Sequence, residues 1–478
     1  MPWSALAAFF FLSCGSAITT RMSLPPHALP PALPSAALLA YAAAHFGKSL
    51  LWYIGELLLI FALTEYVGLS SVAAGFSVAA GLLISAAMGV FAARRWRPGA
   101  NLAWAGRSQW HGIAWAAIAL SLLFLTPLLP PAMRLVCVLL VSLPFRIAYA
   151  VGDVAQNTLI GLARWPWRGA RGVSALRLIG SGLAALSISA AIGLLLRAGE
   201  QTSASIALAF VATVSAIALL SAWWLRQSLQ THVVATTGAP SPAPTLRWQR
   251  QRLLPPSVIA ALSLALPTFT KLAPYLAQTG RSSPGWSCAV LTGYAAGTIL
   301  VQPLASRWLT TALRRLGASG VVLTAFGLLF ALDAARHVWL DGALALGMGM
   351  AAGTAGHWVW ARHAELACSH SAAQQANSIA ILTASAQVAL AIGSALIGLL
   401  LSACDSSDRR HEALAWAMAL GPVVCGLLCV LLAWAGSLAL PLRRKTPACP
   451  AVPAAMPMPN ASAPSSHTCL AASSANSS

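Results

Sequence analysis

Six ionisable residues stand well inside stretches of the chain that are otherwise apolar, away from the ends of these stretches. They are Lys48, Glu56, Arg146, Asp153, Arg177 and Lys271. A charged side chain in hydrocarbon is costly unless it faces a partner or a wet cavity. A carboxylate in such a place can bind a proton or a sodium ion, and an arginine or lysine can bind an anionic or hydroxylated solute. These residues therefore predict either a polar pathway through a membrane or ion pairs that hold helices together.

The stretch 132–163 carries a set of polar residues with the spacing of one helical face. The set is Arg146, Tyr149, Asp153, Gln156 and Asn157. Intervals of three and four residues bring side chains to the same side of a helix. One interpretation is that this face lines a permeation pathway and contacts a solute. The alternative is structural: Asp153 pairs with Arg146 across two turns, or with Arg177, and the pair only holds helices together.

Three further ionisable residues lie in other apolar stretches. Glu56 lies near the middle of the first stretch, where it can bind a coupling proton or sodium ion, or pair with a cation from the fourth or fifth stretch. Asp153 is the second candidate for proton coupling. We expect Lys48 to extend along its helix until its ammonium group reaches the cytoplasmic edge. Lys271 can anchor an anionic or hydroxylated solute, or extend to the membrane edge in the same way.

Motifs that would indicate an enzyme are absent from the sequence. It has no GxxxxGK[ST] loop, no GxSxG turn and no DDxxD site, which removes the usual grounds for an ATP-driven pump or a membrane hydrolase. The group His357, His363, Glu365, Cys368 and His370 has a spacing that matches no zinc signature. We expect this group in a solvated cytoplasmic loop, and we predict no metal site, no cofactor and no enzymatic activity.

The elements that must position these residues are twelve apolar stretches in series. Each is near the roughly 20 residues that a helix needs to cross a hydrocarbon core of roughly 30 Å. The composition agrees, since 58% of residues are hydrophobic, 8% are charged and the mean hydropathy is +0.75. We predict an all-α membrane protein with twelve transmembrane helices. Their expected spans are 46–66, 72–93, 110–129, 132–163, 172–196, 204–225, 257–278, 286–308, 316–332, 342–360, 376–401 and 413–441.

Basic residues are gathered in every second connection between these spans. The side that holds the termini has nineteen basic residues against one acid, Glu365, whereas the other side has six basic residues and seven acids. The nineteen are Arg21, Arg94, Arg95, Arg97, Arg107, Arg164, Arg168, Arg171, Arg226, Arg247, Arg250, Arg252, Arg307, Arg314, Arg315, Arg362, Arg443, Arg444 and Lys445. This asymmetry follows the positive-inside rule, so we expect both termini in the cytoplasm. The net charge of +19 is then a topology signal, and nucleic acid is not needed to explain it.

The connections divide the chain into two similar halves. We predict an N-terminal extension (1–35), a six-helix half (36–225), a cytoplasmic linker (226–256), a second six-helix half (257–445) and a disordered cytoplasmic tail (446–478). The linker and tail are too short and too poor in apolar residues for a folded sensor domain. Abundant arginine and alanine are typical of GC-rich bacterial genomes, so we expect a multi-pass protein of the bacterial inner membrane. It would act as a monomer with the lipid bilayer and a small solute as partners.

Two sets of six helices joined by a basic loop resemble the major facilitator superfamily over residues 36–445. The segment from Gly89 to Pro98 reads GVFAARRWRP, which is similar to the superfamily's GxxxDRxGRR signature with alanine in place of the aspartate. The segment from Pro303 to Arg307 echoes it in the second half. The resemblance implies that Arg94, Arg95 and Arg307 act in gating. Arg146, by its place in the fourth span, would pair helices or act in gating. Without the acid, this loop lacks the carboxylate that takes part in the superfamily's gating contact.

Within that superfamily, the segment from Tyr149 to Leu159, YAVGDVAQNTL, resembles the glycoside-pentoside-hexuronide cation symporters. The resemblance implies that Asp153 and Arg177 contact sugar hydroxyls. Those symporters bind their coupling cation with acids in the second helix, but residues 72–93 contain no acid. Coupling through that helix is therefore unsupported, and Glu56 or Asp153 would have to bind a proton instead.

These patterns together predict a secondary active transporter that moves a small polar solute, such as a sugar or glycoside, by alternating access. The predicted solute-binding residues are Tyr149, Asp153, Gln156, Asn157, Arg177 and Lys271. The alternative is a transporter that exports drugs or other amphipathic compounds. A membrane-embedded enzyme that modifies lipids is a third hypothesis, which is disfavoured because the group from His357 to His370 is the one cluster of acids, histidines or nucleophiles that could serve it. Uniport, export and loss of transport stay open.

Overall fold

The computed structural model describes eleven segments of the chain. They are residues 33–95, 102–163, 165, 169–197, 204–230, 250–279, 285–308, 312–333, 337–367, 372–404 and 409–438. The predicted tail and nearly all of the predicted N-terminal extension lie outside these segments. Most of the predicted linker does too.

Twelve helices in the described segments are long and apolar enough to cross a membrane, so the prediction of an all-helical, twelve-span protein is confirmed. The first span joins α2 (Ser35–Tyr53), η1 (Ile54–Leu58), α3 (Leu59–Phe61) and η2 (Ala62–Tyr66). The second to sixth are α4 (Ser71–Arg94), α5 (Leu102–Leu123), α6 (Pro131–Leu162), α7 (Gly169–Arg197) and α8 (Ala204–Gln230), with η3 (Thr126–Leu128) after α5. The last six are α9 (Arg250–Ala277), α10 (Trp286–Trp308), α11 (Leu313–Asp333), α12 (Val338–Ala367), α13 (Ala372–Cys404) and α14 (Arg410–Leu438).

The first span begins eleven residues earlier than predicted, at Ser35 rather than at residue 46. The added turns are rich in alanine, the best helix former, and they are not a fringe of the bundle, because Ala37, Ala40, Tyr41 and Ala44 are fully buried. The predicted linker is also shortened at both ends. Helix α8 continues to Gln230 and α9 begins at Arg250, so the spans reach into residues 226–256 from both sides.

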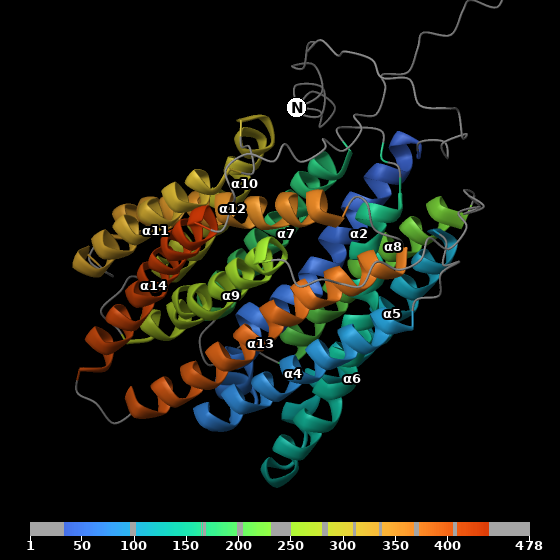
Figure 1. Cartoon of the computed structure of the whole chain (residues 1–478). Helices are drawn as coiled ribbons and strands as arrows, with labels where there is room; N and C mark the ends of the chain where they lie inside the picture. The colour runs from blue at the N-terminus through green and yellow to red at the C-terminus, as the bar shows by residue number, and fades with distance from the viewer. Residues whose placement is uncertain are drawn as a thin grey trace, which may run out of the picture.

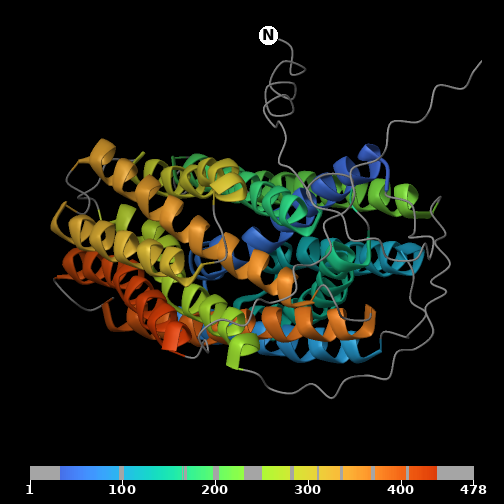
Figure 2. The same ribbon diagram turned by 45° about the horizontal axis from the view of Figure 1, so that its top comes forward.

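The helices run along one general direction as a bundle, with the first half in blue to green and the second in yellow-green to red (Figures 1 and 2). The halves meet along two seams, where α4 packs on α13 and α7 packs on α10. At the first seam a Cβ atom added to Gly75 would lie 2.9 Å from the Cα of Gly398. The backbones of α4 and α13 therefore approach too closely for a side chain at either glycine.

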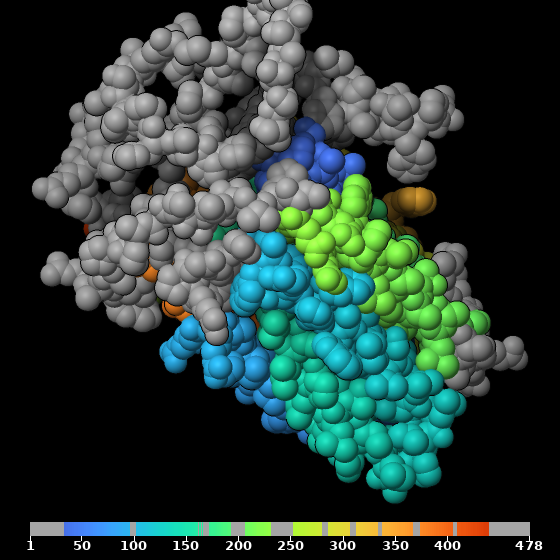
Figure 3. All heavy atoms as spheres, turned by 90° about the vertical axis from the view of Figure 1, so that its right-hand side faces the viewer, coloured from blue at the N-terminus to red at the C-terminus, as the bar shows by residue number. Residues whose placement is uncertain are grey.

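The outer surface of the bundle is apolar. Trp115 on α5, Leu140 on α6 and Leu220 on α8 are each about two-thirds exposed, and these three helices form the face seen in Figure 3. A soluble protein rarely leaves such a broad apolar face uncovered. Hydrocarbon would cover it at no cost, which agrees with a multi-pass membrane protein.

Two short π-helical segments interrupt the first span, η1 at Ile54–Leu58 and η2 at Ala62–Tyr66. π-Helical turns are rare and occur mostly at functional sites. Glu56 lies in the first of them. The carbonyl of Gly55 in the same turn accepts a hydrogen bond from Nη2 of Arg146 at 2.9 Å, so a side chain of α6 supports the altered backbone.

We name the end of the bundle where α2 begins the N-side and the end where the first span stops, at Tyr66, the far side. Each span crosses from one to the other, so the two sides alternate along the chain. These names describe the bundle alone.

Candidate solute site between the two halves

A cavity of about 350 Å³ lies between the two halves. Its walls come from the first span, α6 and α7 of the first half and from α9, α10, α12 and α13 of the second. The polar part of the lining includes His45, Lys48, Glu56, Asp153, Arg177 and Lys271, and the aromatic part is Trp52, Tyr53, Tyr149, Tyr294 and Trp360. An apolar and aromatic wall with a few convergent polar groups is the usual form of a small-molecule site.

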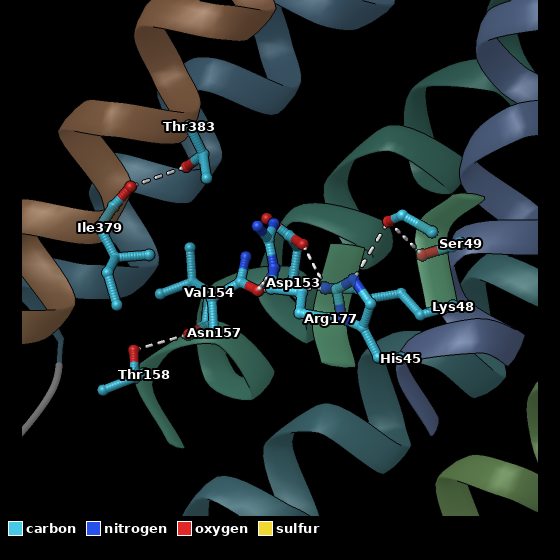
Figure 4. Close-up of polar contacts among 11 residues, drawn as sticks. His45, Lys48, Ser49, Asp153, Val154, Asn157, Thr158, Arg177, Ile379 and Thr383 are labelled. Atoms are coloured by element: carbon cyan, nitrogen blue, oxygen red, sulfur yellow. Dashed lines mark hydrogen bonds and ion pairs between the residues drawn. The ribbon is translucent and has the colours of Figure 1, made fainter. Parts of the chain in front are cut away.

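Lys48, Asp153, Asn157 and Arg177 form one buried cluster on the N-side wall, which we call the N-side cluster (Figure 4). Nζ of Lys48 donates to Oδ1 of Asp153 at 2.6 Å and to Oδ1 of Asn157 at 3.4 Å. The same amide oxygen accepts from Nε of Arg177 at 3.2 Å. Asn157 thereby joins two cations that would otherwise repel each other, and it fixes both side chains at the cavity wall.

Arg177 also reaches across to the second half. Its guanidinium carbon lies 3.4 Å from the centre of the Trp360 ring, within the range of a cation–π contact. Trp360 belongs to α12, and α7 and α12 pack together there. This is a contact between the halves on the N-side of the cavity.

Three small polar side chains extend the N-side wall. His45 and Ser49 on α2 both bond the hydroxyl of Ser181 on α7, with Nε2 of His45 at 3.2 Å and Oγ of Ser49 at 3.1 Å (Figure 4). All three residues line the cavity. They add an imidazole and two hydroxyl groups beside Lys48.

Glu56 is the centre of a second buried group, which we call the Glu56 cluster. Its Oε1 accepts from Nη1 of Arg146 at 2.8 Å and its Oε2 accepts from Nζ of Lys271 at 3.2 Å. Lys271 also donates to Oγ of Ser394 at 2.9 Å. Since Lys271 lies on α9 and Ser394 on α13, the carboxylate of the first span is bound directly to the second half.

On the far side of the cavity the first span meets α9 again. The hydroxyls of Thr64 and Tyr275 bond at 2.8 Å, and the Tyr275 ring packs edge-on against Phe61 with centroids 5.4 Å apart. The cavity therefore has contacts between the halves on both sides. A solute can enter from one side only after the contacts on that side have parted.

Proline alters the backbone at the cavity wall of α9. Pro267 has no N–H to donate, so the carbonyl of Ser263 lacks its helical partner, and both residues line the cavity. An unpaired helical carbonyl is a ready acceptor for a hydroxyl group or a water molecule.

The structure brings most of the predicted site residues together. Glu56, Tyr149, Asp153, Arg177 and Lys271 line the cavity. Their roles in binding and coupling stay predictions.

Two of the predicted solute-binding residues do not line the cavity. Asn157 is fully buried behind Asp153, and it holds the two cations of the N-side cluster in place. Gln156 is fully buried as well, and both polar atoms of its side chain are without a hydrogen-bond partner in the described part of the chain.

The expectation that Lys48 extends to the membrane edge is wrong. Its side chain is 2% exposed and bound to Asp153. The same alternative for Lys271 is also wrong, since that side chain is 3% exposed and bound to Glu56. Each lysine lies within reach of a carboxylate on a neighbouring helix, and a buried pair removes the reason to reach water.

Neither pairing considered for Asp153, with Arg146 or with Arg177, occurs among the described residues. Arg146 and Asp153 are seven residues apart, roughly 10 Å along a helix. Each therefore takes its own partner on the first span, Arg146 with Glu56 and Asp153 with Lys48.

The arginines of the segments that resemble the loop signature make few described contacts. Arg94 and Arg95 are exposed at the end of α4, with Arg95 over the ring of Phe91 at 4.7 Å. The side chain of Arg307 lies outside the described part of the structure. The gating role of these arginines stays a prediction.

The histidine group is not a solvated loop in the part that is described, because α12 continues to Ala367. His357 is buried and bonds Gln302 at 3.2 Å, and Glu365 pairs with Arg362 at 3.3 Å. No group of three or more potential metal ligands occurs among the described residues. Cys368 and His370 lie outside them.

Sequence reasoning missed His45, Ser181, Ser394 and Trp360 as neighbours of the site. His45 was not considered because the predicted first span begins at residue 46, one residue after it. A helix drawn from Ser35 would have placed His45 one turn before Lys48, on the same face. The other three gave no signal in the sequence, since their importance comes from packing between distant spans.

The sequence matches no protein-family model and no curated relative. Similar solved structures include a bacterial homologue of the iron transporter ferroportin in an outward-facing state, with a TM-score of 0.59 and 13% identity over 83% of this chain and 98% of that chain. A mutant of the peptide transporter POT is similar with a TM-score of 0.55 and 15% identity over 84% of this chain and 95% of that one. These likenesses show that this chain has a fold of the major facilitator type.

Proposed function

We propose that the chain is a secondary transporter that moves a small polar solute through the cavity between its halves by alternating access. The observation that carries this proposal is the Glu56 cluster, in which a carboxylate of the first half is held by Lys271 of the second at the wall of the cavity. A purely structural ion pair would not need to lie at a cavity. The transporter fold supports the same function.

In this mechanism the halves rock about the seams, and the contacts on the two sides of the cavity part in turn. On the far side the bond between Thr64 and Tyr275 breaks, together with the pair of Glu56 and Lys271. On the N-side the stack of Arg177 on Trp360 breaks. The solute binds between these two sets of contacts.

Glu56 is the better of the two candidates for ion coupling. A proton on Glu56 would cancel the charge that holds Lys271, and this would release the second half from the first. Asp153 pairs with Lys48 within the first half, so its protonation would change solute binding without parting the halves. Sodium coupling would need the carboxylate of Glu56 to leave both of its cations.

We further propose that the N-side faces the cytoplasm of a bacterial cell, at the inner membrane. The exposed Arg94, Arg95 and Arg107 lie on the N-side, as the positive-inside rule requires of the cytoplasmic face. The predicted cargo, a sugar or glycoside, is consistent with the aromatic wall, since flat rings stack on sugar faces. Export of amphipathic compounds stays the alternative.

Uptake into proteoliposomes tests the proposal. The purified protein would be reconstituted and given labelled sugars, with and without a proton gradient, beside the variants Glu56→Gln and Asp153→Asn. Glu365→Gln serves as a matched control, because Glu365 forms a half-buried pair within one helix, away from the cavity. We expect gradient-driven uptake that Glu56→Gln uncouples and Glu365→Gln leaves intact. Transport of hydrophobic dyes with no uptake of polar solutes would favour export of amphipathic compounds instead.

A further inference from the structure

We infer that the solute is a small organic anion, which the cavity binds through a carboxylate or phosphate group. The inference rests on the proposed function and names the class of its solute. It comes from the balance of buried charge around the cavity and from the contacts of Arg177.

The buried charges around the cavity do not cancel. Four basic side chains belong to the two clusters, whereas the acids number two, Glu56 and Asp153. The basic residues are Lys48, Arg146, Arg177 and Lys271. A buried charge without a counter-charge is strongly unfavourable. The described wall therefore has a surplus of positive charge that an anionic solute would neutralise.

Arg177 is the cation whose charge is least satisfied. It is the one member of the four that has no salt bridge to a carboxylate among the described residues. Among the described residues, Arg177 donates one hydrogen bond, from Nε to Asn157, and its face lies on Trp360. Its two terminal nitrogens thus stay available at the cavity wall. A guanidinium held in this way is a rigid fork that matches the two oxygens of a carboxylate or phosphate.

The two lysines can add to this recognition. An ammonium group has three donors. Lys48 uses two of them, on Asp153 and Asn157, and Lys271 uses two, on Glu56 and Ser394. One donor of each lysine remains for a solute. The aromatic wall of Trp52, Tyr149 and the other rings would cover the organic part of such an anion.

The same contacts disfavour a cationic solute. Both oxygens of Glu56 and one oxygen of Asp153 are already bound to basic groups. A metal ion or an amine would have to displace those groups and then face the remaining positive charge. One structurally similar protein is described as an iron transporter homologue, but the described wall of this cavity has the opposite charge preference.

Matched solutes test the inference. Uptake into proteoliposomes would be measured for two series, glycerol with glycerate and glycerol 3-phosphate, and glucose with glucuronate and glucose 6-phosphate. Within a series only the charged group changes, and the acid and phosphate members separate the two sources of negative charge. We expect an anionic member to be taken up at least tenfold faster than its neutral counterpart.

Variants of Arg177 provide the second readout. Arg177→Gln should raise the KM of the preferred anion by about 10- to 100-fold, because a charge-assisted pair is lost, and should remove the preference over the neutral counterpart. Arg177→Lys keeps the charge but not the fork, and should retain part of the preference. Arg107→Gln changes an exposed arginine of α5 and should alter neither value. The thermal unfolding midpoint of each variant would show that it is folded.

The outcomes separate the inference from the proposed function. Equal uptake of neutral and anionic members would overturn the inference and leave the transporter proposal standing. A preference for the anion that Arg177→Gln does not change would overturn the role of Arg177 as the anion's fork. No uptake of any member, from a folded protein, would count against the proposed function and against the inference with it.

Discussion

Replacement of Glu56 by glutamine should destabilise the protein more than any other single change of a carboxylate to an amide. Glu56 is 6% exposed and holds two basic side chains, Arg146 and Lys271, with one oxygen each. Glutamine keeps the shape and one acceptor oxygen but removes the charge. Two buried cations are then left facing each other without the anion between them.

The size of the effect follows from the burial of the cluster. Breaking a buried pair by removing one partner costs about 3–5 kcal/mol. At about 2 cal/mol/K of unfolding entropy per residue, this corresponds to a fall in Tm of about 10 °C if one six-helix half unfolds as a unit, and about 5 °C if both unfold together. Exposed or half-buried pairs contribute about 0–1 kcal/mol.

The assay is thermal unfolding of the purified protein in a mild detergent. Glu365→Gln is the matched control, since its partner Arg362 and the carboxylate are both 24% exposed. The double variant Glu56→Gln with Lys271→Met restores the original charge of the cluster, so it should recover part of the lost Tm. The reasoning is refuted if Glu56→Gln lowers Tm no more than Glu365→Gln, or if the second substitution lowers Tm further by its full single effect.

Three further predictions concern other contacts. Lys48→Met should lower the free energy of unfolding by about 3–5 kcal/mol, because Asp153 loses its salt bridge. The double variant Lys48→Met with Asp153→Asn should lose less stability than Lys48→Met alone. Tm compares the two variants, and additive losses would contradict the pair. Gly398→Ala should lower the free energy of unfolding by about 1–3 kcal/mol, because the new Cβ would lie 2.7 Å from a backbone oxygen of α4. The control Gly356→Ala, whose Cβ would have nothing within 4 Å, should be neutral or stabilising by up to about 1 kcal/mol. Equal effects of the two variants on Tm would disprove the tight seam. Tyr275→Phe should lower stability by about 1 kcal/mol through the lost bond to the first span and leave the ring contact intact, and an unchanged Tm would show that this far-side bond contributes nothing.

Hydropathy predicted the twelve spans because each helix must present enough apolar surface to the membrane, whatever its neighbours are. The ends were less certain. The first span was started at residue 46 because alanine is only weakly apolar, although Ala37, Ala40 and Ala44 pack fully into the bundle. A hydropathy argument counts how apolar a residue is and does not register how closely a small residue lets helices approach.

The sequence predicted most residues of the candidate site but not which of them form salt bridges. Ionisable residues in apolar stretches identified Glu56, Asp153 and Lys271, because burial of charge is costly and therefore rare. The partners could not be deduced, since Lys48 meets Asp153 over 105 positions of the chain and Lys271 meets Glu56 over 215. Such pairs depend on which helices pack together and on their rotation about their axes. Gln156 shows the limit of the face argument, because one helical face is wide enough to turn some of its residues toward a neighbouring helix.

The two π-helical segments of the first span have a consequence for the comparison of this chain with its homologues. Each π turn takes up one more residue than an α-helical turn, which shifts the phase of the side chains beyond it by about 100°. Glu56 lies inside η1, so the full shift applies to the residues after Leu58, such as Phe61, whose ring packs on Tyr275. A relative with an unbroken α-helix can keep both Glu56 and Phe61 in place only if its sequence is one residue shorter within Ile54–Leu58. An alignment without a gap there would pair Phe61 with a residue on a different face. Homologues that share the site should therefore be sought by allowing a single deletion within the first span, even though gaps inside membrane helices are usually forbidden.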